Sequence, residues 1–393
     1  MKKVIKPAFY DSFSCIAGDC SLTCCQEWKI AVDDDTYKDW KKLGLGADEG
    51  RPLSNYVKRK DHAGIITLDR NLKCPFLRED KLCQLVSELG EQVLSQTCTT
   101  FPREVHEFSD RVEMSMVACC PEVVDFLNRM ESFSLTETCE EDRQVVEGTK
   151  AEALELEYHL LGIRAFLLQI LESQGYSNER KLLMIFYILQ DLYHREQEQE
   201  EVLAAYKAQG ALAELSKAMD QIPGDLPEFI AENNELFLDL VDNYRKEGLY
   251  SRYLEDISVY AEELSEDYES EELLHNWETF EKEFASYSGL LQKYLQLEFF
   301  TDSLLPESDL EEMVAMVQWI AMEYAAIRHA IFLRWLLDGQ KMLEYTTIRD
   351  YMVVISRMTG YDEEDIFEYL ENSFEELIWQ WGYFSLLTGN FPE

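Results

Sequence analysis

The sequence lacks several motifs that commonly identify an enzyme. It contains no P-loop and no His-Glu-x-x-His pair, so neither Walker-type phosphate binding nor that class of zinc hydrolase is predicted. Its nearest approach to a Rossmann fingerprint is Gly44-Leu45-Gly46-Ala47-Asp48-Glu49-Gly50. There the third glycine comes one residue late, and Arg51-Pro52 follows where a helix should begin. A dinucleotide-binding fold or a Rossmann methyltransferase is therefore not expected.

The chain is also poor in basic residues and long apolar runs. Its 36 Lys and Arg face 77 Asp and Glu, a net charge of −41. Such a surface repels phosphate, so neither nucleic acid nor an anionic membrane is expected as a partner. No apolar run approaches the roughly 18 residues of a membrane span, and residues 1–7 lack the apolar stretch of a signal peptide. These absences predict a soluble, cytoplasmic protein.

What is present divides into two parts. Residues 1–127 hold 17 basic and 21 acidic residues, a net charge of −4, which leaves −37 to residues 128–393. Nine of the ten cysteines lie in the first part. The sequence therefore predicts a mainly α protein with two domains. An irregular, cysteine-rich metal or cluster domain (1–127) packs on an acidic, all-helical domain (128–393).

Helical periodicity dominates the second part. Apolar residues recur at helical spacing between acidic faces over Leu154 to Leu171 and over Arg180 to Tyr193. Ser308 before Glu311-Glu312 is typical of a helix start. Further helices are expected over three later stretches: Leu310 to Leu337, Tyr345 to Met358 and Glu363 to Leu387. The first part is predicted to hold a helix over Leu82 to Leu94 and another starting near Pro121.

The cysteines follow a definite order. Cys15, Cys20, Cys24 and Cys25 come first, then Cys74, Cys83 and Cys98 singly, and then Cys119-Cys120. A disulfide framework requires an oxidising compartment, whereas dense reduced thiols indicate a metal or an iron–sulfur cluster. Thiolate ligation suits both zinc and an iron–sulfur centre, and the spacing leaves both open. The pattern of radical adenosylmethionine enzymes is broken, because Glu27 occupies the place of its third cysteine.

At these cysteines the chain resembles the flagellin lysine N-methylase family, which belongs to a group with a CxxxCxxCC signature. The resemblance covers about the first 127 residues, through Tyr10 to Cys15, Asp19 to Ile30, Cys74 to Leu77, Leu82 to Leu85, Thr97 to Arg103, Glu113 to Ser115 and Cys120 to Glu122. It implies methylation of lysine side chains on flagellin with S-adenosylmethionine, and a [4Fe–4S] cluster held by family cysteines, with zinc as the alternative. The implied ligand pool is Cys15, Cys20, Cys24, Cys25, Cys74, Cys83, Cys98 and Cys120.

Other candidates are chosen because they lie near these cysteines in the sequence. Arg103 is a candidate for the cofactor carboxylate, and Trp28 and Tyr10 are candidates for stacking on the cofactor. Glu27 and Glu113 are candidate bases, since methylation needs a neutral amine. An ordinary structural role is the alternative for each of the five.

Two other functions are consistent with the same residues. One is a non-enzymatic metal-binding or metal-delivery protein that uses the thiols. The other is an interaction protein in which the metal is a structural clip and the acidic helices dock a basic partner. Methyl transfer to flagellin separates both from the enzyme.

Overall fold

The structure, a computed structural model, describes residues 2–45, 51–60, 63–140, 151–222, 224–265, 268–360, 362–374 and 379–391. Most of the glycine run considered above, residues 46–50, lies outside these ranges. The described part is mainly helical with a mixed N-terminal region, which confirms the predicted fold class. Within it, no helix combines the length and apolar character that crossing a membrane requires.

The N-terminal region contains two small sheets. The larger has the order β5-β6-β1-β7 and comprises β1 (Lys2–Pro7), β5 (Arg103–Glu107), β6 (Arg111–Met116) and β7 (Leu135–Glu140). β1 runs parallel to β6 and antiparallel to β7. The smaller has the order β2-β4-β3 and comprises β2 (Ala31–Val32), β3 (Val57–Lys60) and β4 (Ala63–Ile66). β7 was not foreseen, so the chain beyond residue 127 becomes helical only after that strand.

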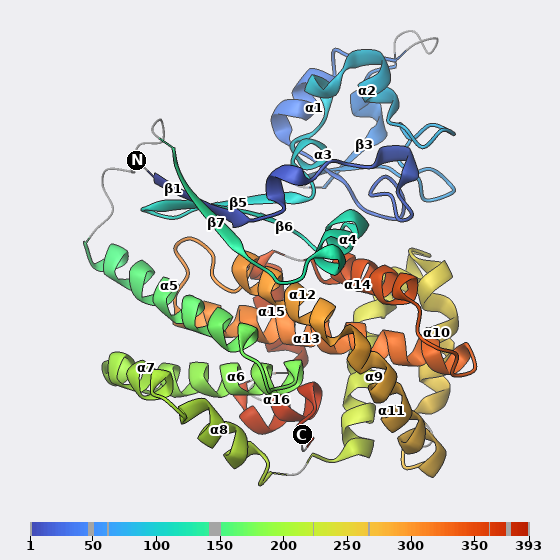
Figure 1. The fold of residues 1–393 in the computed structure, drawn as a ribbon. Helices are drawn as coiled ribbons and strands as arrows, with labels where there is room; N and C mark the ends of the chain where they lie inside the picture. Colours follow the sequence, from blue (N-terminus) through green and yellow to red (C-terminus); the bar gives the residue numbers. More distant parts are fainter. Residues whose placement is uncertain are drawn as a thin grey trace.

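Four helices accompany the sheets: α1 (Asp34–Trp40), α2 (Gln84–Leu89), α3 (Gln96–Thr100) and α4 (Pro121–Arg129). The helix expected over Leu82 to Leu94 is shorter than predicted, because Gly90 at φ +89° ends it. Pro121 opens α4, as the sequence indicated. Helices α1 to α3 and the smaller sheet form a lobe that stands above the larger sheet in Figure 1, here called the small lobe.

The remaining helices form the body below the larger sheet (Figure 1). They are α5 (Ala151–Glu172), α6 (Asn178–His194), α7 (Gln199–Lys207), α8 (Ala211–Met219), α9 (Leu226–Lys246), α10 (Ser251–Leu264), α11 (Glu271–Phe284), α12 (Ser288–Thr301), α13 (Leu310–Leu337), α14 (Tyr345–Thr359), α15 (Glu363–Phe374) and α16 (Trp381–Thr388). The single helix predicted over Glu363 to Leu387 is wrong, because α15 ends at Phe374 and α16 begins at Trp381, after Gln380, whose backbone is extended.

α13 is the central helix of this body. It is buried on almost every side, as expected for a helix that is apolar all round. Asp309 and Glu312 form a capping box at its start, where the sequence predicted a helix to begin. Around it, one continuous apolar core extends from Phe9 and the α4 side chains to α16.

The small lobe has a separate core. It is built on Trp40, Leu53 and Phe76, with Cys74 among its buried residues. Cys25, Cys83 and Cys98 pack against it. The two cores are distinct, and residues of both line the cavity described below.

Candidate active site

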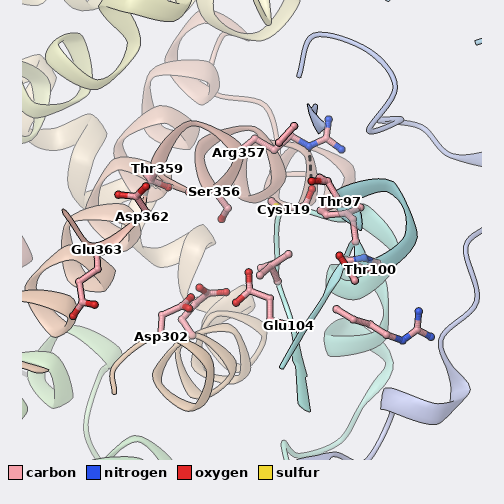
Figure 2. Close-up of a pocket in the computed structure, with 18 of the residues that line it drawn as sticks. Thr97, Thr100, Glu104, Cys119, Asp302, Ser356, Arg357, Thr359, Asp362 and Glu363 are labelled. Atoms are coloured by element: carbon pink, nitrogen blue, oxygen red, sulfur yellow. Dashed lines mark hydrogen bonds between the residues drawn. The ribbon is translucent and has the colours of Figure 1, made fainter. Parts of the chain in front are cut away.

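A cavity of about 770 Å³ lies between the small lobe, the larger sheet and the helical body. The small lobe contributes Trp28, Val32 and the α3 residues Thr97 and Thr100. Strand β5 contributes Glu104, and helices α12 to α15 supply the opposite side. Figure 2 shows Thr97, Thr100 and Glu104 on one side of the central space, with Thr359, Asp362 and Glu363 on the other. The volume is within the range of sites for small molecules.

One side of the cavity is lined by four carboxyl groups, called the acidic wall: Glu104, Glu298, Asp302 and Glu323. Glu298 and Glu323 are buried, at 8% and 7% exposure. In Figure 2, Glu104 and Asp302 approach one another from β5 and from the end of α12. Burial, together with the neighbouring carboxyls, raises the pKa of Glu298 and of Asp302 well above the usual range.

Glu298 and Glu323 differ in how their oxygens are satisfied. Glu323 accepts a hydrogen bond from Ser356 Oγ at 2.7 Å and further bonds from the hydroxyls of Tyr294 and Thr359. Glu298 Oε1 is buried and has no hydrogen-bond partner among the described residues. The acidic wall therefore contains a buried acceptor available to a donor that enters the cavity.

A second side of the cavity is aromatic and cationic. Trp28 meets Phe101 edge-on at 4.6 Å, and the Arg357 guanidinium lies 5.4 Å from the Trp28 ring centre. Arg357 comes from α14 but donates to Cys119 O at 3.0 Å and Leu22 O at 2.7 Å. It therefore ties the helical body to two of the cysteine-bearing loops (Figure 2).

The ten cysteines are all free thiols. Eight of them form two neighbouring groups. In the first, burial and the nearby thiols of Cys98, Cys83 and Cys24 raise the pKa of Cys74 to about 12. Burial, with Cys24 and Cys83 nearby, likewise raises the pKa of Cys98 to about 11. Cys25 joins this group through the hydrogen bond from Cys74 N to Cys25 O at 2.8 Å.

The second group surrounds the first cysteine loop. Burial, with Cys20 and Cys24 nearby, raises the pKa of Cys120 to about 12. The pKa of Cys20 is raised mainly by burial, and the nearby thiols of Cys24 and Cys15 raise it further. Cys24 is a neighbour in both groups, and the pKa of its thiol is raised by a hydrogen bond with Cys25 and by burial. The two groups contain the eight cysteines of the predicted ligand pool, and their ligation of a metal stays a prediction.

Thiols in this arrangement can be compared with the known requirements of metal ligands. Neutral buried thiols deprotonate readily only beside a positive charge, which a metal supplies. Zn–S bonds of about 2.3 Å place tetrahedral sulfur ligands about 3.8 Å apart. In the described ranges, no three Sγ atoms lie within 4.8 Å of one another. The described thiols are therefore not preformed as a closed tetrahedral zinc site.

The other predicted residues fall in different places. Trp28 and Arg103 line the cavity, although Arg103 donates to Phe13 O at 3.2 Å and lies against Tyr10, 5.4 Å from its ring centre. Tyr10 is buried and is not among the residues that line the cavity. Glu27 is also absent from the lining, and its carboxylate accepts from Tyr250 N at 3.1 Å, at the start of α10.

Glu113 lies in the core. Its carboxylate is 1% exposed and accepts from Arg164 at 2.5 and 2.7 Å. It is not among the cavity residues. A carboxylate held in a buried ion pair has no open access to a substrate amine, so the geometry favours a structural role there.

The sequence analysis missed Cys119, Arg357 and the acidic wall. A signal existed for Glu298 and Glu323, because each is an isolated acid in an otherwise apolar stretch of helix. Acidic residues are rarely fully buried unless they are paired or functional. Arg357 gave no local signal, since its partners are more than 200 residues away in the chain.

Comparison with known proteins connects this architecture to a family. A model described as the FliB lysine N-methylase C-terminal domain matches residues 164–387. The flagellar biosynthetic protein FliU of Salmonella muenchen is 37% identical over 139 residues, 34% of this chain and 82% of that protein. No solved structure matches.

Two proteins named lysine-N-methylase, from Salmonella choleraesuis and Salmonella typhimurium, are 36% identical over 139 residues. The alignment covers 34% of this chain and 35% of each of them. The chain therefore matches about a third of the length of these curated lysine N-methylases.

Proposed function

Because the chain belongs to the FliB lysine N-methylase family, we propose that it is a protein-lysine N-methyltransferase and that the cavity is its active site. One observation carries the proposal. The same cavity is lined by the cysteine-bearing region and by helices within the matched residues 164–387. A methyltransferase needs one space in which a methyl donor and an acceptor amine meet, and this cavity has the volume for it.

The proposed methyl donor is S-adenosylmethionine, which supplies an electrophilic methyl group on a sulfonium. In this proposal the Trp28 ring stacks on an aromatic or cationic group of the methyl donor. Arg103, which lines the same cavity, is the candidate that binds the carboxylate of the methyl donor. The chain must also exclude water from the reacting amine. The apolar residues Phe101, Met316 and Ile320 line the cavity and serve that purpose.

The proposed metal centre is a [4Fe–4S] cluster, with zinc as the alternative. The cysteines that would hold it are drawn from the two thiol groups around Cys24. Such a centre would supply a Lewis-acidic anchor beside the cavity and would fix the loops that carry Trp28 and Cys119. Cys119, the neighbour of the candidate ligand Cys120, lines the cavity, and a metal centre held by these cysteines would therefore stand close to the acceptor site.

The proposed acceptor is flagellin. Two supports for it are the flagellar name of the relative from Salmonella muenchen and the acidic character of this chain. A lysine is attracted to an acidic surface, and a net charge of −41 favours a lysine-bearing patch over an acidic one. Recognition would be local, at the mouth of the cavity.

Anaerobically purified protein tests this proposal directly. It is incubated with flagellin and methyl-labelled S-adenosylmethionine, and label in flagellin is counted. Wild-type protein should transfer label, Cys98→Ser should lose transfer, and Cys139→Ser should retain it, because Cys139 is exposed and lies outside the two groups. Metal uptake by wild-type protein without any transfer would instead favour the metal-delivery alternative.

A further inference from the structure

The acidic wall has no lysine or arginine partner in the part of the chain that the structure describes. Among the described residues, no Lys or Arg forms an ion pair with Glu104, Glu298, Asp302 or Glu323. The two arginines at the cavity direct guanidinium N–H groups to backbone carbonyls, Arg103 to Phe13 and Arg357 to Leu22 and Cys119. Four carboxyl groups along one wall thus share a space into which no described Lys or Arg directs its charge, and His106, 3.7 Å from Glu104, is the basic side chain beside them.

Glu298 is the buried member of this wall with an open acceptor. Its side chain is nine-tenths buried, and Oε1 has no partner among the described residues. An unsatisfied buried acceptor of this kind costs free energy unless a ligand supplies a donor. Since the residue lines the cavity, that donor would come from a molecule in the cavity.

We infer that the acidic wall is the binding site for the acceptor ammonium, and that Glu298 accepts its proton with Asp302 as the adjoining carboxyl. This inference rests on the proposed function. An ammonium carries three donors on one nitrogen, which matches several carboxyl oxygens converging on a small volume. A narrow aliphatic side chain also fits beside the apolar residues Met316 and Ile320, which line the same cavity.

The proton transfer completes a balanced reaction. The ammonium N–H bond breaks, the proton moves to a Glu298 carboxylate oxygen, and the nitrogen keeps the electron pair. That pair forms the new N–C bond to the methyl carbon, while the S–C bond breaks and its pair stays on sulfur as a neutral thioether. Asp302 and Glu104 are partly exposed and provide a route by which the proton leaves to water.

The surroundings of Glu298 suit it to this role. Glu104 faces it from β5, Asp302 from the end of its own helix, Glu323 from α13, and Cys119 from the loop before α4, while His106 lies beside Glu104 and Asp302. Mutual repulsion and burial make this carboxylate a stronger base than an exposed one. Glu323 is held by three hydroxyl donors and keeps the wall acidic.

A divalent metal ion is the competing ligand for this wall. Donor atoms of Glu104, His106 and Asp302 all lie within 4.8 Å of one another. His106 Nε2 is buried without a partner and stands 3.7 Å from Glu104. The ammonium is favoured because it also satisfies Glu298, which lies outside that trio, and because methylation requires an amine and a base in one place.

The test measures binding to the full chain without a methyl donor. The probe is Nα-acetyl-lysine-N-methylamide, and the neutral probe of equal chain length is Nα-acetyl-norleucine-N-methylamide, both followed by calorimetry. The lysine probe should bind at least about tenfold more tightly, and Glu298→Gln and Asp302→Asn should each remove most of this difference. Glu368→Gln, an exposed acid on α15, removes one charge and should not alter binding.

Three results would overturn the inference. They are equal binding of the two probes, unchanged lysine binding in both variants, and stoichiometric Mn²⁺ binding that Asp302→Asn abolishes and the lysine probe does not displace. A methyl-transfer assay distinguishes failure of the proposed Glu298 role from failure of the proposed methyltransferase function. Wild-type kinetics in Glu298→Gln would refute the base while leaving the methyltransferase intact, whereas absence of transfer by wild-type protein would refute the function itself.

Discussion

Replacing Arg357 tests how the helical body and the cysteine loops are joined. Its side chain is 4% exposed and donates to Leu22 O at 2.7 Å and Cys119 O at 3.0 Å, while its contact with Thr23 O, at 3.5 Å, is at the limit of a hydrogen bond. Arg357→Met keeps the aliphatic stem but leaves these carbonyls without their donor.

The magnitude follows from the two short bonds. A hydrogen bond from a charged donor contributes about 1.5–3 kcal/mol, and a buried acceptor left unpaired retains its desolvation cost. Counting the contact at 3.5 Å as nothing, the free energy of unfolding should fall by about 3–5 kcal/mol. The matched control is Arg334→Met on α13, where the side chain is 32% exposed and pairs with Asp338 four residues away. That change should cost at most about 0.5 kcal/mol.

Urea unfolding of both variants measures the difference, and hydrogen exchange locates it. In Arg357→Met, the amides of the loop around Leu22 to Cys25 should exchange faster than in wild-type protein. The increase in exchange rate should be smaller for the amides in the middle of α6. A loss below about 1 kcal/mol, or one equal to that of Arg334→Met, would refute the view that this arginine joins the two parts.

Three further predictions concern other parts of the chain. Glu113→Gln should destabilise by about 3–5 kcal/mol, because it leaves Arg164 charged and buried. The double variant with Arg164→Met should recover part of that loss in thermal unfolding, and an intact kcat in the folded fraction would exclude Glu113 as the base. Removing metal with a chelator should lower the melting temperature of wild-type protein and of Cys139→Ser alike, but not that of Cys98→Ser prepared without metal. Burial lowers the pKa of His329 to about 3, against an ordinary value near 6.5. The stability that neutral His329 contributes is therefore complete above about pH 6.5 and is lost as the pH falls toward 3. Between these pH values, the urea midpoint of His329→Gln should fall less steeply than that of wild-type protein.

The sequence predicted the parts of this molecule that local pattern determines. The bounds of α13 agree with the apolar run from Leu310 to Leu337, and α14 begins at Tyr345 as expected. The resemblance at the cysteines implied a pool of eight ligands, and several of these thiols lie close enough to influence one another's pKa, whereas their ligation of a metal stays a prediction. The physical reason is that helical periodicity and ligand type are both written in short stretches of chain.

Long-range features could not be read in the same way. β1 carries three lysines and does not alternate cleanly, and its partner β6 begins more than 100 residues later. Register between such strands depends on tertiary packing rather than on either segment. For the same reason, Asp302 and Glu104 were not seen as neighbours, since they meet only when α12 packs beside the larger sheet.

Trp28 and Arg103 are residues whose general location, but not whose contacts, could be predicted from the sequence. They were selected because they lie near cysteines in the sequence, and both line the cavity. Glu27 was selected in the same way, but its positive φ of 56° turns the chain so that its carboxylate meets Tyr250 N at the start of α10. Proximity in sequence therefore located the region, whereas backbone direction decided which side chains reach the cavity.

The most direct measurement of the central claim is peptide mass spectrometry of flagellin after incubation with anaerobically purified protein and S-adenosylmethionine carrying a deuterated methyl group. With wild-type protein, we expect deuterated methyl groups on the side-chain nitrogen of flagellin lysines. With Glu298→Gln, the amount of deuterated methyl-lysine should be greatly reduced at neutral pH. Flagellin that remains unlabelled beside folded, metal-loaded wild-type protein would contradict the assignment of this cavity to lysine methylation.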